Sequence, residues 1–125
     1  MADASPYHLE FHRSPRGDCP AGDFLESLPE RARAKAAAWL GLLRERGPGL
    51  GRPYADVLDG PIRELRVSFG RLEIRILYFI EGRAIVATHG FLKKSRRVGW
   101  EEIERAKWCR SEWLTRVGRG RCHEA

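Results

Sequence analysis

The chain has 125 residues, is 42% hydrophobic, and carries a formal net charge of +6 with a pI near 9.7. This length suits one domain, and the apolar content excludes an intrinsically disordered chain because it supplies enough side chains for a core. A basic surface favours anionic partners such as nucleic acid, acidic proteins or anionic lipid, although charge alone neither chooses among them nor requires any.

The three cysteines, Cys19, Cys109 and Cys122, are widely spaced and form no Cys-x-x-Cys motif. No cysteine–histidine set has the spacing of a zinc site and the carboxylates are scattered, so we expect no metal and no cofactor. The first residues lack the apolar core of a signal peptide, and no apolar run approaches the ~20 residues that span a membrane. We therefore expect a reduced, cytoplasmic protein with no membrane partner.

Residues 7–13, "YHLEFHR", alternate between apolar and polar side chains, which predicts a short strand followed by a turn-rich loop. Apolar residues then recur at three- and four-residue spacing over 24–46, which is typical of a helix with one buried face. Asp23 is the expected N-cap, and Pro29 divides the segment into a short helix ending near Ser27 or Leu28 and a longer one beginning there. The segment "GPGLGRPY" ends the second helix.

Residues 62–92 contain three predicted strands. Gly70-Arg71 separates the first two, and glycine at the first central position is typical of a two-residue type II′ hairpin turn. This turn places Phe69 opposite Leu72, and the register then places Arg66 opposite Arg75 on one face. The pairs expected on the other face are Leu65 with Ile76 and Val67 with Ile74.

The third strand, "AIVATHGFL" at 84–92, has a register that the sequence leaves open. A three-residue loop over 81–83 would place His89 opposite Arg75. A two-residue loop would place Thr88 there and turn His89 to the other face.

Residues 100–116 predict a last helix, with Gly99 as a weak N-cap and acidic residues in its first turn. Its inward stripe is imperfect and consists of Ile103, Ala106, the stem of Lys107, Arg110, Trp113 and Leu114. Residues 117–125 are expected to form a basic, flexible tail. The prediction is a single α+β domain over 1–116, with its helices packed on one face of an antiparallel sheet.

The Arg66–Arg75 pair is the most informative feature, because like charges across a ladder cost about 0.2–1 kcal/mol. Either Glu64 and Glu73 neutralise the pair diagonally, or the two guanidinium groups hold a phosphate, whose oxygens they fit well.

A cationic run follows the third strand. Lys93, Lys94, Arg96 and Arg97 form either a solvated surface or a track for an RNA or DNA backbone. Phe91 is either a base-stacking platform or a core residue, and His89 is either a general acid or base or a packing residue.

Three segments together resemble the HigB-type, phage-derived branch of the RelE-like toxin superfamily. They are "FLESLPERARAKAAAWLGLLRERG", "LDGPIRELRVSFGRLEIRILYFIEGRAIVATHGFLKKSRR" and "EEIERAKW", within a resemblance that runs from about Phe24 to Trp113. The resemblance implies a RelE-like fold, in which an N-terminal strand and two helices pack on an antiparallel sheet with a C-terminal helix. It also implies a toxin of a type II toxin–antitoxin system, an mRNA endoribonuclease that cuts messages on translating ribosomes without a metal and is neutralised by a helix-turn-helix antitoxin.

By this resemblance, Arg66 and Arg75 match basic sheet positions of the family, and Lys93 and Lys94 match its lysine pair. The chemistry of RNA cleavage then assigns Arg66 and Arg75 to the scissile phosphate, with either His89 or a lysine of lowered pKa as the acid or base. The expected RNA-binding residues are Phe91, Lys93, Lys94, Arg96 and Arg97. The sequence departs from the family where Val98-Gly99-Trp100 replaces a proline before the last helix, and where Pro61 and Arg63 stand in place of an aromatic. The alternative function is a non-catalytic basic module of the same fold that binds RNA or protein, and the exposed sides of the helices over 24–46 are the expected antitoxin-docking face.

Overall fold

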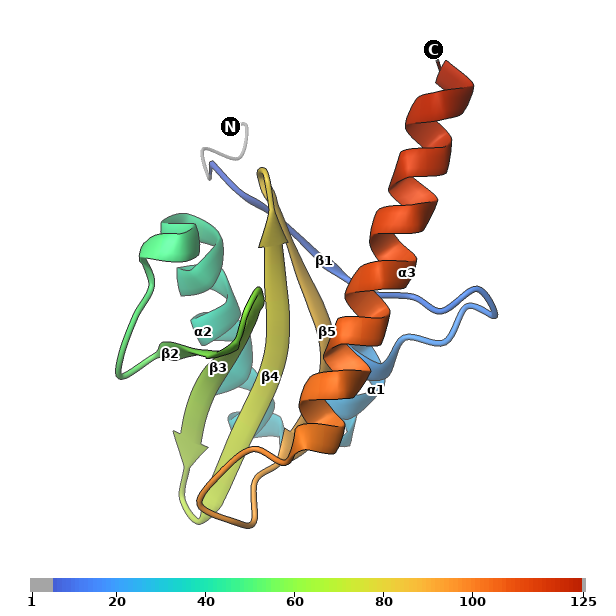
Figure 1. Ribbon diagram of the computed structural model, residues 1–125. Coiled ribbons are helices and arrows are strands. Elements are labelled where there is room, and N and C mark those ends of the chain that lie inside the picture. The colour runs from blue at the N-terminus through green and yellow to red at the C-terminus, as the bar shows by residue number, and fades with distance from the viewer. Residues whose placement is uncertain (1–5, 125) are drawn as a thin grey trace.

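Figure 1 shows a computed structural model of the chain, which describes the backbone of residues 6–124 and the side chains of residues 6–118. The elements in chain order are β1 (His8–Phe11), α1 (Pro20–Ser27), α2 (Glu30–Arg46), the 3-10 turn η1 (Gly47–Gly49), β2 (Ala55–Asp59), β3 (Ile62–Phe69), β4 (Leu72–Glu81), β5 (Ala84–Leu92) and α3 (Trp100–Glu124). The predicted α+β class is confirmed.

The sheet has five strands in the order β1-β5-β4-β3-β2. Strands β2 to β5 form an antiparallel meander, and β1 pairs in parallel with β5. Strand β2 was not predicted, because its five residues follow directly on the glycine- and proline-rich segment and carry only a weak apolar alternation. This strand extends the sheet beyond β3 and so forms one wall of the site described below.

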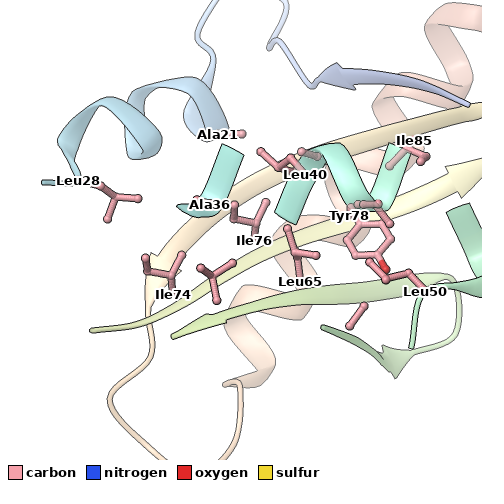
Figure 2. Close-up of a cluster of buried hydrophobic side chains, with 14 of the residues drawn as sticks. Ala21, Leu28, Ala36, Leu40, Leu50, Leu65, Ile74, Ile76, Tyr78 and Ile85 are labelled. Atoms are coloured by element: carbon pink, nitrogen blue, oxygen red, sulfur yellow. The ribbon is translucent and has the colours of Figure 1, made fainter. Parts of the chain in front are cut away.

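The helices cover both faces of the sheet, so the prediction that all of them pack on one face is wrong. Helices α1 and α2 cover one face, where the larger core includes Leu40, Leu65 and Ile76 (Figure 2). Helix α3 crosses the other face, where Ala106 and Trp113 pack on sheet residues that include Phe79. Strand β4 requires helices on both faces of the sheet, because its apolar run supplies side chains to both cores.

The β3–β4 hairpin has the predicted register, with Phe69 opposite Leu72 and Arg66 opposite Arg75. Gly70 has a φ of +58°, and no residue other than glycine has a positive φ among those described. A type I′ turn would need positive φ at Arg71 as well, so the turn is the predicted type II′.

The β4–β5 register differs from both expected pairings. A two-residue turn at Gly82-Arg83 sets Glu81 opposite Ala84, and an irregularity at Thr88 then shifts the ladder by one residue. As a result Phe91 lies opposite Arg75, and His89 lies opposite Leu77. The bulge at Thr88 keeps His89 on the face that Arg66 and Arg75 share, because it inserts one residue into an alternation of period two.

The predicted break at Pro29 is confirmed, with α1 ending at Ser27 and α2 beginning at Glu30. The expected N-cap at Asp23 is wrong because α1 already begins at Pro20, where proline suits a first turn.

Helix α3 begins at Trp100, after the expected cap, and continues to Glu124, past the predicted end at residue 116. Of the expected inward stripe, Ala106 and Trp113 are buried and Ile103, Lys107, Arg110 and Leu114 are half-buried. Cys109, which was not expected in the stripe, is also buried. A flexible tail was expected over residues 117–125. The side chains from residue 119 on lie outside the described residues.

We predict that Gly90→Ala destabilises the fold, because a Cβ at this position in β5 would lie 2.3 Å from the Phe24 ring of α1. Overpacking of this kind costs about 1–3 kcal/mol, which urea unfolding would measure. The matched control is Gly41→Ala in α2, whose Cβ meets no atom within 4 Å. That variant should gain up to about 1 kcal/mol, and equal stability of Gly90→Ala and the unmodified chain would contradict the packing described.

Candidate functional site

The charged end of the sheet is built around Arg75 in β4. Its side chain is 3% exposed, and its Nε lies 3.2 Å from Oε1 of Glu64, which is also buried. Neither of these two atoms makes an aligned hydrogen bond, so their contact is electrostatic. The Nη1 atom of Arg75 donates to the carbonyl of Ile74 at 3.0 Å and lies 3.4 Å from Glu73. Two carboxylates therefore compensate this buried charge, and Glu64 is the nearer.

Arg66 lies across the ladder from Arg75, and its side chain is 34% exposed. Its Nη1 lies 3.4 Å from Oε2 of Glu64, so one carboxylate bridges the two arginines. The structure thus contains the diagonal neutralisation that the sequence left as one alternative. It also gives the two arginines different surroundings, because Arg75 is enclosed and Arg66 reaches the surface.

A groove of about 460 Å³ lies between β2, β3 and the loop that joins β5 to α3. The charged residues that line it are Arg52, Asp56, Glu64, Arg66, Lys93, Arg96 and Arg97. Five cations against two carboxylates give this cationic groove an excess of three positive charges. Such a surface suits an oligoanion with phosphate groups, since guanidinium groups bind phosphate oxygens well.

Arg52 and Asp56 form the outer wall of the cationic groove. The Nε and Nη2 atoms of Arg52 donate to Oδ2 of Asp56 at 2.9 and 2.7 Å. The hydrogen bond from Arg52 lowers the pKa of the Asp56 carboxyl below its usual value. The Arg52 side chain is 74% exposed, and an exposed pair contributes little to stability, so an anion would compete readily with Asp56 for Arg52.

His89 in β5 is 1% exposed, and its Nε2 lies 2.9 Å from Oε1 of Glu102 in the first turn of α3. Burial lowers the pKa of His89, against the opposing effect of the hydrogen bond to Glu102, so the ring is neutral at neutral pH. Because an ionised carboxylate can only accept a hydrogen bond, Nε2 of the neutral ring carries the hydrogen and donates a hydrogen bond to Glu102. The Nδ1 atom is then an acceptor, and the Thr88 hydroxyl lies 3.1 Å from it and 3.3 Å from the carbonyl of Leu77. The single hydroxyl hydrogen can serve only one of these acceptors, and Nδ1 is the nearer.

A second, smaller pocket of about 240 Å³ opens on the other side of the same loop. We call it the dyad pocket, because Glu102 of the His89–Glu102 pair lines it. Its other lining residues include Phe91, Lys94 and two residues shared with the cationic groove, Lys93 and Arg97. The two pockets therefore flank the loop between β5 and α3.

Phe91 stacks on His89, with ring centroids 5.8 Å apart and an interplanar angle of 29°. It is half-buried against the smaller core and also lines the dyad pocket. Phe91 is thus partly a core residue and partly a lining residue.

Contacts to β1 and the loop after it fix α3 across the sheet. The Trp113 indole donates to Glu10 at 2.8 Å, and Nε2 of the buried His12 lies 2.7 Å from Glu112. Arg116 donates both to Glu112 and to the carbonyl of Arg13. These contacts hold the helix that carries Glu102.

All eight predicted site residues lie on the α3 side of the sheet end or in the loop that follows it. Arg66, Lys93, Lys94, Arg96 and Arg97 line the two pockets, whereas Arg75 and His89 are enclosed beneath them. Arg52 and Glu102 were not among the predicted site residues. Glu102 carried a usable signal, because it lies four residues before Ala106 on the stripe of α3 that faces the sheet.

Other reactive side chains take no part in this site. Tyr78 points into the larger core, and burial raises its pKa to about 12. Burial also raises the pKa of the Cys109 thiol. Within residues 6–118, no three histidines, cysteines or carboxylates gather into a possible metal site. None of the helices in the described part of the chain is both long and apolar enough to cross a membrane.

Comparison with known proteins identifies the family. Residues 23–109 match the family described as "Phage derived protein Gp49-like (DUF891)". A search of curated proteins gave no match.

Two solved structures resemble the chain in fold. The toxin–antitoxin complex RelBE2 from Mycobacterium tuberculosis contains a chain 21% identical, with a TM-score of 0.51, covering 70% of this chain and 99% of that one. The archaeal RelE–RelB complex from Pyrococcus horikoshii contains a chain 18% identical, with a TM-score of 0.51, covering 74% of this chain and 99% of that one. At this identity the likeness shows the fold, and it confirms the expected RelE-like architecture. Assignment to the HigB-type branch stays a prediction. The chain belongs to the phage-derived Gp49-like family and has a RelE-like fold.

Proposed function

We propose that the protein is the toxin of a type II toxin–antitoxin system and acts as a metal-independent mRNA endoribonuclease on translating ribosomes. The observation that carries this proposal is the shared wall of the two pockets. Lys93 and Arg97 belong both to the cationic groove and to the pocket lined by Glu102, whose partner is His89. Phosphate-binding cations and a proton-transfer pair therefore flank one loop.

The residue types suit RNA cleavage by the substrate's own 2′-hydroxyl. This reaction needs a group that takes the hydroxyl proton and fixed cations that stabilise the charge on phosphorus, and it needs no metal. Arg66 is the cation proposed for the scissile phosphate, because its guanidinium is exposed in the cationic groove. Lys93, Lys94, Arg96 and Arg97 would hold flanking phosphates.

In this proposal Arg75 is buried beneath the cationic groove and acts through Glu64, without contacting the phosphate itself. Because it is enclosed and holds Glu64, it fixes the carboxylate that in turn orients Arg66. It is thus a positioning residue, in place of the direct phosphate contact expected from the sequence.

The proposed partners are a helix-turn-helix antitoxin, messenger RNA and the ribosome. The Mycobacterium tuberculosis structure is a toxin–antitoxin complex and the Pyrococcus horikoshii structure is a complex of RelE with RelB, which supports an antitoxin partner. The exposed side of α2, which lies on the opposite face of the sheet from α3 (Figure 1), is the proposed docking face.

A non-catalytic module that binds RNA or an acidic protein is the second candidate. The enclosure of His89 favours it, since a histidine that is 1% exposed does not itself reach a substrate. Cleavage separates the two functions, because a module binds in a salt-sensitive way but leaves RNA intact.

We predict that Arg66→Ala abolishes most of the toxicity while the fold is retained. Loss of one fixed cation at the scissile phosphate should slow cleavage by about 10²–10³-fold. Primer extension on messages from induced cells would measure the loss of discrete cut ends. The matched control is Arg33→Ala on the exposed face of α2, which removes the same charge far from the groove and should leave the cut pattern unchanged. An Arg66→Ala variant as toxic as the unmodified chain would refute the assignment.

We predict further that Glu64→Gln destabilises the protein by about 3–5 kcal/mol, because it leaves the buried charge of Arg75 without its nearest carboxylate. Urea unfolding would measure the change. Glu73→Gln is the control, since Glu73 is 44% exposed and should cost far less. Equal effects of the two substitutions would show that Arg75 does not depend on Glu64.

A further inference from the structure

His89 and Glu102 form one hydrogen-bonded pair but differ in access. The His89 side chain is 1% exposed, whereas that of Glu102 is 34% exposed and lines the dyad pocket beside Lys93 and Arg97. A group that exchanges a proton with RNA must come within hydrogen-bond reach of it. Of this pair, only Glu102 meets that condition in the structure.

We infer that Glu102 is the catalytic residue that takes the proton from the RNA 2′-hydroxyl, and that His89 and Thr88 are positioning residues behind it. This inference rests on the nuclease function proposed above. It assigns the proton-transfer role to an acidic residue of α3 and removes it from the histidine of β5.

A series of hydrogen bonds, here called the positioning chain, runs from Glu102 in the dyad pocket through His89 to Thr88 in the sheet. The Nε2–H of His89 holds Oε1 of Glu102 at 2.9 Å, which leaves the second carboxylate oxygen without this partner. The Thr88 hydroxyl holds Nδ1 of His89 at 3.1 Å and lies 3.3 Å from the carbonyl of Leu77. The bulge at Thr88 is what allows this chain, because it places the hydroxyl beside the ring of the following residue.

The charged groups around His89 are consistent with a neutral ring. Glu102 and Arg105 face it from α3 and act on its charge in opposite directions. On the sheet side, the nearest strand positions carry Arg75 and Glu64, which are paired with each other. A neutral ring keeps its Nε2–H directed at the carboxylate, which stays the proton acceptor of the pair.

In the proposed step, the 2′-hydroxyl proton moves to the Glu102 carboxylate as the bond from O2′ to phosphorus forms. The bond from phosphorus to the 5′-oxygen breaks, and that oxygen takes a proton from water. The hydroxide left behind removes the proton from Glu102, so the enzyme is restored. The products are a 2′,3′-cyclic phosphate and a 5′-hydroxyl end.

Glu102→Gln tests the catalytic role, because glutamine keeps the shape and accepts from His89 but is not a base. Single-turnover cleavage of a messenger on programmed ribosomes should be about 10²–10⁴-fold slower for the Glu102→Gln variant of the 125-residue chain than for the unmodified chain. Binding of a fluorescein-labelled single-stranded RNA should be unchanged. Glu104→Gln is the matched control, since Glu104 is an exposed carboxylate on α3 outside both pockets, and it should cleave at the unmodified rate. Glu102→Asp keeps a carboxylate but moves it back from the pocket, so its cleavage rate should lie between those of the unmodified chain and Glu102→Gln. It serves as the test variant in place of Glu102→Gln if the glutamine variant fails to fold.

Thr88→Val and Thr88→Ser test the positioning role. Valine removes the hydroxyl and should slow cleavage about tenfold, whereas serine keeps it and should restore the rate. The ¹⁵N shifts of His89 give a readout independent of cleavage, with a protonated Nε2 and a bare Nδ1 expected in the unmodified chain. A proton on Nδ1 would overturn the positioning chain.

The outcomes separate the two proposals. If the unmodified chain leaves the messenger intact, the nuclease function fails and the inference falls with it. If the unmodified chain cleaves and Glu102→Gln cleaves equally fast, the inference alone is overturned.

Discussion

Arg75 brings a full, buried positive charge onto the central strand β4, and the arrangement of the charged end of the sheet depends on how that charge is compensated. Its partner Glu64 is also buried, and removal of one member of such a pair is far more costly than loss of a surface pair. Because Glu64 uses its second oxygen for Arg66, the buried pair also sets where the exposed guanidinium lies. The stability of this end and its proposed anion binding are therefore linked through one carboxylate.

A second constraint comes from the apolar content of β4 on both of its faces, which requires helices on both sides of the sheet. Helix α3 meets that need, and its first turn then lies over His89. The loop that connects β5 to α3 carries the lysines and arginines to the rim of both pockets. The packing of the smaller core thus places Glu102, and the cationic loop follows from the connection.

Much of this fold could be predicted from residues whose local chemistry has one solution. Gly70 determines the β3–β4 turn and hence the Arg66–Arg75 pairing, and Pro29 determines the break between α1 and α2. The face of His89 could not be predicted, because turn length and the bulge at Thr88 act together on an alternation of period two. Burial of Arg75 and the role of Glu102 depend on α3 crossing the second face, which no local pattern reveals.

The proposed function requires that RNA bind at the sheet end beside the β5–α3 loop. The most direct measurement is an NMR titration of the ¹⁵N-labelled chain with a short single-stranded RNA at low and high salt. We expect salt-sensitive shift changes at Arg66, at residues 93–97 and at Glu102, with the exposed face of α2 unaffected. Changes confined to α2, or none at the β5–α3 loop, would contradict it.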